Sequence, residues 1–383
     1  MGEPAEDGMY RVKTSPNLSL ARRGIAKEVR FVLTVEISSI YSTLDLTGAK
    51  KTRRVHTVFI MPSIQAAGKF RTALEKKGAN LKSDGRPIVG ISAEELAKLA
   101  FDIEPRAMVV PAHIWTPWFA MFGSMSGFDS VEECFGAVAD KIFAVEMGMS
   151  SDPGMNWRVK NLDRMALLAS SDSHSLHRLA REGNAFEIES LKKLSYEWLY
   201  NTIKKKDPKK FLYTVKYYPQ EGRYHYDGHA DCDFSCLPSE TKRLRGLCPK
   251  CGRKLTVGVL SRVAELADRQ EGYIPKNAIP TKHLVPLEEV IASCFGMGAQ
   301  SKKVQAAYEA LVKAAGGEYQ VLLDLPYEEL AKMTEPIIVE GIRRNREEKL
   351  HIEPGYDGKY GVVKIFTDEE RREFAGKKQE ALF

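Results

Sequence analysis

Carboxylate and imidazole side chains occur where several predicted strands end. Asp172 and His174 belong to a Ser-Asp-Ser-His segment that follows an apolar run, and Glu36 and His113 occupy comparable strand ends. In an extended loop, residues i and i+2 point the same way, so Asp172 and His174 can reach one ion. Such ligands suit zinc, manganese or iron, which predicts a metal site. The alternative is a loop in which Asp172 accepts backbone N–H bonds. His56, near the start of its predicted strand, is less well placed.

The elements that must position these residues alternate between strands and helices. Short apolar, β-branched runs predict strands at 29–37, 55–61, 107–111, 142–147 and 166–170. Helices are expected at 63–76, from Ser92 to about 101, and near 129–139, the first two opened by serine caps. The alternation indicates a parallel α/β sheet or barrel. Function in such folds lies past the carboxyl ends of strands, where Glu146 also falls.

Four cysteines form the most specific local pattern in the sequence. They lie in two close pairs, at Cys232, Cys236, Cys248 and Cys251. This spacing predicts a structural zinc bound by four thiolates, in a module too small to have much core without its metal. His229 could replace one cysteine, although we favour four thiolates. Cys134 and Cys294 stand in apolar contexts and are expected to pack in the core.

The balance of charge is mildly basic. The net charge is +6 and the pI is about 8.8, which permits nucleic-acid binding. Basic residues cluster at 204–210, 242–254 and 343–346. Each run could be a solvated face, but three runs favour a polyanionic partner. No apolar run reaches the roughly 18 residues of a membrane span, and the start lacks an apolar leader, so we expect a cytoplasmic protein.

A tryptophan-rich segment follows the third predicted strand. It carries His113, Trp115, Trp118, Phe119 and Phe122 within ten residues. Large aromatic side chains are costly to expose, so one interpretation is a hydrophobic lid on the sheet. The functional alternative is a surface on which a nucleobase stacks.

These segments together resemble the endonuclease Q branch of the PHP (polymerase and histidinol phosphatase) superfamily. The matching motifs are T-V-E-I at 34–37, R-V-H at 54–56, S-D-G-R-P at 83–87, P-A-H-x-W-T-P-W-F at 111–119, E-x-G-x-S-x-D at 146–152, S-D-S-H at 171–174, H-R-L-x-R-E at 177–182, the cysteine pairs, and P-G-Y-D-G-x-Y-G at 354–361. The resemblance covers nearly the whole chain. It implies a PHP-type (β/α)7 barrel, a zinc module and a helical C-terminal domain, with boundaries expected at 1–218, 219–257 and 258–383.

The resemblance also implies an activity and its residues. The activity is metal-dependent cleavage of DNA on the 5′ side of a deaminated base (uracil, hypoxanthine or xanthine) or an abasic site. The implied catalytic metal ligands are Glu36, His113, Asp172 and His174, with His56 as a weaker candidate, for Zn²⁺, Mn²⁺ or Mg²⁺. The residues expected to contact DNA are Arg86, Trp115, Trp118, Phe119, His177, Arg178 and Arg181.

One motif of the PHP family is missing. PHP proteins open with a strand that carries H-x-H, whereas the first histidine of this chain is His56. We therefore expect the first barrel strands to be absent, either because the true start codon lies upstream or because the chain is a degraded paralogue. The alternatives to a nuclease are a DNA-binding paralogue with impaired catalysis and a PHP-type phosphatase, which the zinc module and helical domain disfavour.

Overall fold

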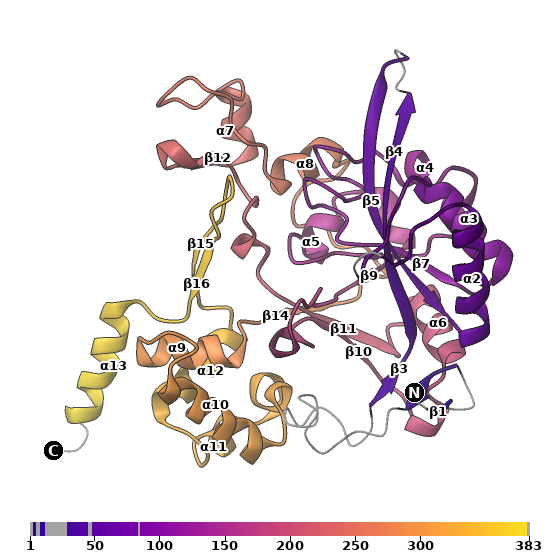
Figure 1. Cartoon of the computed structure of the whole chain (residues 1–383). Coiled ribbons are helices and arrows are strands. Elements are labelled where there is room, and N and C mark those ends of the chain that lie inside the picture. Colours follow the sequence, from indigo (N-terminus) through magenta and orange to yellow (C-terminus); the bar gives the residue numbers. More distant parts are fainter. Residues whose placement is uncertain (1–2, 5–7, 12–28, 45–47, 83–84, 381–383) are drawn as a thin grey trace.

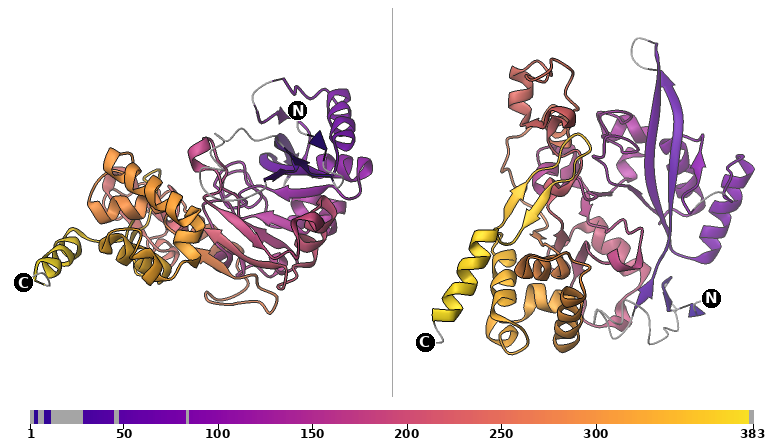
Figure 2. Two further views of the ribbon diagram at one scale, coloured as in Figure 1. Left: turned by 90° about the horizontal axis from the view of Figure 1, so that it is seen from below. Right: turned by 60° about the vertical axis from the view of Figure 1, so that its left-hand side comes forward.

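A long antiparallel hairpin dominates the N-terminal half of the computed structural model. The structure describes residues 3–4, 8–11, 29–44, 48–82 and 85–380. Strands β4 (Leu33–Leu44) and β5 (Lys50–Met61) pair along their full length, with Ser38 opposite His56. The strands extend beyond the predicted ranges because their polar outer halves pair only with each other. That end of the hairpin projects from the body (Figure 2).

The hairpin belongs to a four-stranded sheet with the order β6-β4-β5-β7. Its outer strands are β6 (Ile88–Val89) and β7 (Met108–Pro111). Helices α2 (Ile64–Lys76) and α3 (Ala93–Ile103) begin where the serine caps predicted, since Ser63 and Ser92 accept the backbone N–H of Ala66 and Glu95. Both helices pack their apolar faces on the sheet in the largest hydrophobic core. Ser83 and Asp84 of the S-D-G-R-P motif lie outside the described residues.

Parallel pairing occurs only in part of the fold. Strands β8 (Ala144–Glu146) and β9 (Ala166–Leu168) are parallel, as is the short β4–β6 contact, but β5 is antiparallel to both of its neighbours. The expected parallel sheet is therefore corrected to a mixed one, because only residues 45–49 separate β4 from β5, too few for a parallel crossover connection. The intervening helices are α4 (Val131–Phe135), η1 (Gly136–Lys141), α5 (Pro153–Asn156) and η2 (Lys160–Arg164).

A third sheet connects this half to the rest of the chain. Its order is β10 (Gly183–Phe186), β11 (Phe211–Lys216) and β14 (Thr281–His283). Around it lie η3 (Leu176–Arg178), η4 (Leu191–Lys193), α6 (Tyr196–Lys205) and η5 (Pro219–Glu221). Three two-residue strands near the N-terminus form a separate small sheet: β1 (Glu3–Pro4), β2 (Tyr10–Arg11) and β3 (Arg30–Phe31).

The cysteine segment forms a small lobe apart from the main sheets (Figure 1). It contains β12 (Asp227–His229), η6 (Ala230–Cys232), β13 (Phe234–Cys236) and α7 (Pro238–Arg243). Among the described residues, its buried apolar cluster consists of Cys236, Cys248 and Leu255. The lobe is therefore held by very little core of its own, as the sequence predicted.

The C-terminal part is mainly helical and has its own core. The helices are α8 (Val259–Leu266), α9 (Leu287–Phe295), α10 (Lys302–Ala315), η7 (Gln320–Asp324), α11 (Tyr327–Leu330), α12 (Pro336–Arg346) and α13 (Asp368–Glu380). Strands β15 (His351–Glu353) and β16 (Val362–Lys364) form a hairpin that reaches toward the cysteine lobe (Figure 1). Within the described residues, no helix is long and apolar enough to cross a membrane.

Candidate metal centre and cavity

Three side chains converge where β4, β5 and the end of β7 meet. Glu36 Oε1 lies 3.0 Å from His56 Nδ1 and 3.6 Å from His113 Nε2, and the two imidazole nitrogens are 3.1 Å apart. All three ligand atoms lie within 4.8 Å of one another. We call this group the Glu–His cluster. The hairpin register explains it, because Ser38 faces His56 and Glu36, two residues along β4, lies on the same face.

The surroundings fix the charge of each member of the Glu–His cluster. Burial alone would raise the pKa of Glu36, but hydrogen bonds with His113 and His56 outweigh it and lower the pKa, so the carboxylate is ionised. Burial lowers the pKa of His56 and keeps its ring neutral. Burial also opposes ionisation of His113, yet the charges of Glu36, Glu146 and Asp172 raise its pKa.

The E-x-G-x-S-x-D motif supports His113 from the neighbouring strand. The carboxylate of Glu146 accepts the backbone N–H of His113 at 2.9 Å. Gly148 has φ +63°, and a Cβ on it would lie 2.4 Å from the Cβ of His113, so only glycine fits. Lys216 donates to the carbonyl of Gly148 and pairs at 2.6 Å with Glu182, and both of these side chains are fully buried. His113 is thereby supported by Glu146 of the β8–β9 sheet and, through the carbonyl of Gly148, by Lys216 of the sheet that contains β11.

Not every predicted metal ligand joins the Glu–His cluster. Asp172 is exposed, with φ +41°, but its charge acts on His113 and it lines the same cavity. His174 is exposed and its ring contacts the backbone carbonyl of Asp172 at 2.9 Å. His56 belongs to the cluster although it was rated the weakest candidate. Its position was misjudged because β5 begins at residue 50, which places His56 mid-strand.

His113 of the Glu–His cluster lines a cavity of about 560 Å³. The residues that line it come from the tryptophan-rich loop, the loops after β8 and β9, the segment 217–225 and the β15–β16 hairpin; they include His113, Trp118, Asp172, Arg178, Tyr224 and Tyr360. Residues distant in the sequence thus share one surface beside the candidate metal centre. The cavity size is typical of small-molecule sites.

The predicted DNA-contacting residues divide into exposed and buried sets. Trp115 is buried and donates its indole N–H to Asn156 at 2.8 Å, so the structure does not support it as a stacking surface. Phe119 packs its ring 4.8 Å from that of His56. Trp118 is 37% exposed and stands edge-on to Tyr224 at the cavity. The lid interpretation therefore fits Trp115, whereas stacking on a base stays a prediction for the exposed Trp118.

The four basic candidates also differ in their surroundings. Arg86 lies 3.4 Å from Glu36 and is partly exposed. Arg178 is exposed at the cavity. His177 and Arg181 instead contact Glu288 on α9, so they join the segment between β9 and β10 to the helical part. This ion-paired cluster was not expected from the sequence.

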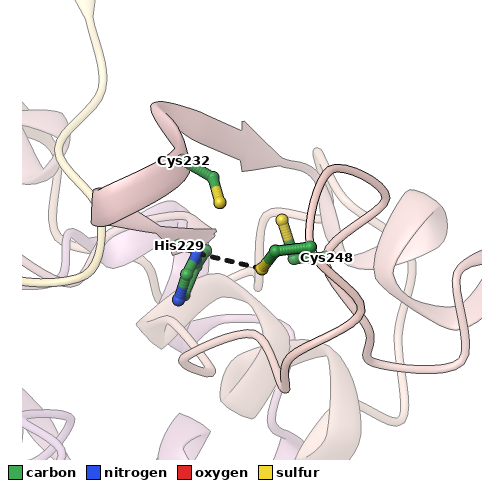
Figure 3. A group of neighbouring side chains, drawn as sticks. His229, Cys232 and Cys248 are labelled. Carbon is green, nitrogen blue, oxygen red and sulfur yellow. Dashed lines mark hydrogen bonds between the residues drawn. The ribbon is translucent and has the colours of Figure 1, made fainter.

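The cysteine lobe brings together a second group of possible ligands. Ligand atoms of His229, Cys232, Cys248 and Cys251 lie within 4.8 Å of one another, and Cys251 Sγ is 3.6 Å from His229 Nδ1. Figure 3 shows His229, Cys232 and Cys248 facing one another. The expected fourth thiolate, Cys236, instead contacts the hydroxyl of Thr241 at 3.2 Å at the end of β13. In this group His229 lies where the fourth thiolate was expected.

Comparisons with known proteins agree with this architecture. Residues 286–349 match the family described as the MJ0043 C-terminal domain. The uncharacterized protein MJ0043 of Methanocaldococcus jannaschii is 34% identical over 253 residues, 65% of this chain and 31% of that protein. The uncharacterized protein YqxK of Bacillus subtilis is 27% identical over 316 residues, which is 81% of this chain and 74% of YqxK. This chain therefore spans about a third of the archaeal relative.

Solved structures provide the decisive match. The crystal structure of the lesion-specific endonuclease PfuEndoQ from Pyrococcus furiosus superposes with a TM-score of 0.78 at 30% identity, over 97% of this chain and 85% of that one. The chain belongs to the endonuclease Q family. A second endonuclease Q structure, in complex with a 27-mer duplex that has an abasic lesion at the active site, gives the same TM-score and identity over 84% of its chain. Family membership accounts for the mixed α/β fold and the cysteine group found together.

Proposed function

We propose that this protein is a metal-dependent DNA-repair endonuclease that cuts the phosphodiester on the 5′ side of a deaminated base or an abasic site. The observation that carries the proposal is the convergence of Glu36, His56 and His113 beside a cavity lined by Arg178 and Arg181. Family membership supports the nuclease class. The proposed bases are uracil, hypoxanthine and xanthine, and DNA is the proposed partner.

The donor atoms of the Glu–His cluster fit a divalent ion. Two ligand atoms that are each about 2.1 Å from a tetrahedral ion lie about 3.4 Å apart. The observed separations of 3.0, 3.1 and 3.6 Å are close to that value. One anionic carboxylate and two imidazoles form a ligand set used by zinc, and also by manganese and iron. Asp172 and His174 remain proposed ligands from the neighbouring loop.

The residues of the chain have separable roles in this proposal. A divalent ion bound here would supply an acidified water and charge stabilisation at the phosphate. Glu36 contributes the negative charge that retains a cation, and Glu146 fixes His113 through its backbone N–H. Thr116 contacts the far nitrogen of His113 at 3.1 Å, which leaves Nε2 directed at Glu36. Arg178, exposed at the cavity, is the proposed contact to a phosphate of the cut strand.

The second group is proposed to hold a structural zinc. Three thiolates and one imidazole are a common zinc set, and sulfur ligands of one zinc are expected about 3.8 Å apart. Burial opposes ionisation of Cys248, but backbone N–H groups of Lys250 and Cys251 lower its pKa, as a metal ligand requires. We propose His229 as the fourth ligand in place of Cys236.

The proposed architecture is a PHP-type barrel at 1–218, a zinc module at 219–257 and a helical DNA-binding domain at 258–383. Separate cores support the first and third units, and the small cysteine cluster supports the second. Trp118 is the proposed residue for stacking on a base beside the lesion.

An incision assay tests the proposed function. A labelled duplex with one uracil, one hypoxanthine or one abasic site is incubated with Mg²⁺ or Mn²⁺ and the protein. We expect a nick on the 5′ side of the lesion that Glu36→Gln slows by about a thousandfold, because removal of one ligand charge weakens the site. Glu75→Gln, an exposed glutamate on α2, is the matched control. Lesion-specific binding without any nick would overturn the nuclease proposal and favour the DNA-binding paralogue.

A further inference from the structure

The outer half of the β4–β5 hairpin carries a row of polar side chains on one face. Residues 40–44 and 50–54 form strand pairs only with each other. Because side chains alternate along a strand, the even positions of β5 share the face of the Glu–His cluster. These positions hold the exposed Lys50 and Thr52 and the partly exposed Arg54, which we call the outer row. The row leads away from the candidate metal centre along the projecting hairpin (Figure 2).

The opposite face of the outer half is used by the fold itself. Buried Arg53 donates to the hydroxyl of Thr43 at 3.1 Å and to the carbonyl of Gly127. Its guanidinium also lies 4.0 Å from the ring centre of Phe128. Arg53 is therefore a structural cation, and its contacts leave it no room for a ligand from solvent. The outer row, on the other face, has no such covering.

Arg54 connects the outer row to the Glu–His cluster. Its guanidinium lies 5.8 Å from the ring centre of Phe119, whose ring is 4.8 Å from that of His56. Its backbone N–H donates to the carbonyl of Ser126 at 3.3 Å, which holds this part of β5 against the loop that follows β7. Among the described residues, neither Arg54 nor Lys50 has a carboxylate partner. Two cations beside the metal centre are therefore open to an anion from solvent.

The spacing of the outer row suits a chain of phosphates. Two residues of a strand span about 6.8 Å, which is similar to the separation of neighbouring phosphorus atoms along one DNA strand. Counted from the metal centre, the row offers a guanidinium, a hydroxyl and an ammonium group, all of which donate to phosphate oxygens. We propose, building on the function proposed above, that the outer row binds successive phosphates of the damaged strand on one side of the phosphodiester to be cut.

This role differs from recognition of the lesion. Contacts to phosphates position DNA without reading its bases, so the outer row should add the same affinity for every lesion. It should also help to fix which phosphodiester lies at the Glu–His cluster. Lys50 is six residues along β5 from His56, a distance of about 20 Å. The row therefore extends the proposed DNA contacts well beyond the cavity at which Arg178 is exposed.

Methylphosphonate linkages, which carry no charge, test the order of these contacts. Each phosphate near the lesion is replaced in turn in a duplex with one tetrahydrofuran abasic site. Binding is measured by fluorescence anisotropy without added divalent ion. We expect the wild type to bind about fivefold more weakly at each of several neighbouring positions on one side of the lesion. Arg54→Gln should lose this sensitivity at the position nearest the cut, and Lys50→Gln at the farthest, because a contact already removed cannot be lost again.

The dependence of binding on salt is a second measure. Each phosphate contact contributes about 0.9 to the slope of log K against log salt, so Lys50→Gln combined with Arg54→Gln should reduce the slope by about 1.8. Lys51→Gln combined with Lys69→Gln is the charge-matched control. It removes one exposed lysine from the opposite face of the hairpin and one from α2, and its slope should equal that of the wild type.

The outcomes separate this inference from the proposed nuclease activity. Loss of sensitivity at the expected phosphates, in the expected order, supports the outer row. An unchanged pattern in both single variants, or equal weakening by the control pair, overturns it whether or not the protein cuts DNA. Lys50→Gln alone keeps the test valid if Arg54→Gln fails to fold, because Lys50 is exposed and lies outside the core. A wild type that shows the phosphate pattern but never nicks a lesion would retain the outer row and lose the nuclease proposal.

Discussion

The two groups of possible metal ligands are built in opposite ways. The Glu–His cluster is carried by two 12-residue strands and a loop, over the largest hydrophobic core of the protein. The cysteine group lies on two three-residue elements, β12 and η6, and on the loop that follows α7; the buried apolar cluster of this lobe, within the described chain, consists of Cys236, Cys248 and Leu255. In the first region, paired strands and a hydrophobic core hold the ligands in place without an ion. In the second region, a bound ion would be needed to stabilise the fold. The regions should therefore respond differently to the same treatments.

Removal of metal should produce the largest difference between the two regions. We expect a strong chelator to unfold residues 229–254, because structural zinc contributes on the order of 10 kcal/mol to such modules. The Glu–His region should keep its cooperative unfolding, since its strands are paired and buried without an ion. Hydrogen exchange with and without chelator measures both. Continued protection of residues 229–254 in the chelator would contradict the comparison.

Cysteine variants supply the control for this experiment. Cys248→Ser and Cys251→Ser should each remove one equivalent of zinc, as should replacement of His229 by alanine. Cys236→Ser should retain the zinc, because its sulfur contacts Thr241 and lies outside the ligand group. Loss of zinc from Cys236→Ser, with zinc retained in the His229 variant, would instead support the site of four thiolates that the spacing predicts.

Disruption of the support behind His113 should have the next largest effect. Lys216→Met leaves the carboxylate of Glu182 buried without its partner, which typically costs about 3–5 kcal/mol. Chemical denaturation should show this loss, while zinc content stays unchanged because the cysteine lobe does not contact the pair. The double variant Lys216→Met with Glu182→Gln should recover much of the stability. A double variant as unstable as the single one would show that packing, not charge, dominates there.

The smallest expected effect concerns the helix that follows the cysteine lobe. Buried Arg262 of α8 binds the carbonyls of Phe122 and Phe128 and pairs with Asp129, which lowers the pKa of Asp129 below its usual 3.8. A depressed folded pKa stabilises the protein above pH 3.8 and ceases to do so as the pH falls through the folded value. Asp129→Asn should cost about 0.5 kcal/mol at pH 7, since Asp129 is mostly exposed.

Chemical denaturation at a series of pH values tests the direction of this pH dependence. Free energies of unfolding of the wild type and Asp129→Asn should converge below pH 3.8. A gap that widened on acidification would mean that the ion pair with Arg262 does not stabilise this junction.

Local sequence rules predicted some of these features and not others. The caps at Ser63 and Ser92 were predicted correctly, because capping depends on residues three apart. His56 was only the weaker candidate ligand, since its proximity to Glu36 depends on the register of a hairpin whose polar half gives no strand pattern. The four-thiolate set stays a prediction. The spacing favours Cys236 as the fourth ligand, whereas the structure groups His229, at the end of β12, with the other three cysteines.

The β15–β16 hairpin has a consequence for the order in which the protein is synthesised. Its tip holds the cysteine lobe, as Asp357 accepts the N–H of Ala230 at 2.6 Å and Lys359 pairs with Asp233 at 2.9 Å. Its flanks complete the cavity wall through Tyr360 and Gly361. A ribosome must therefore make more than 350 residues before these contacts can form. Because domains fold as they emerge, the Glu–His cluster can fold early, but the cavity closes only near the end of translation.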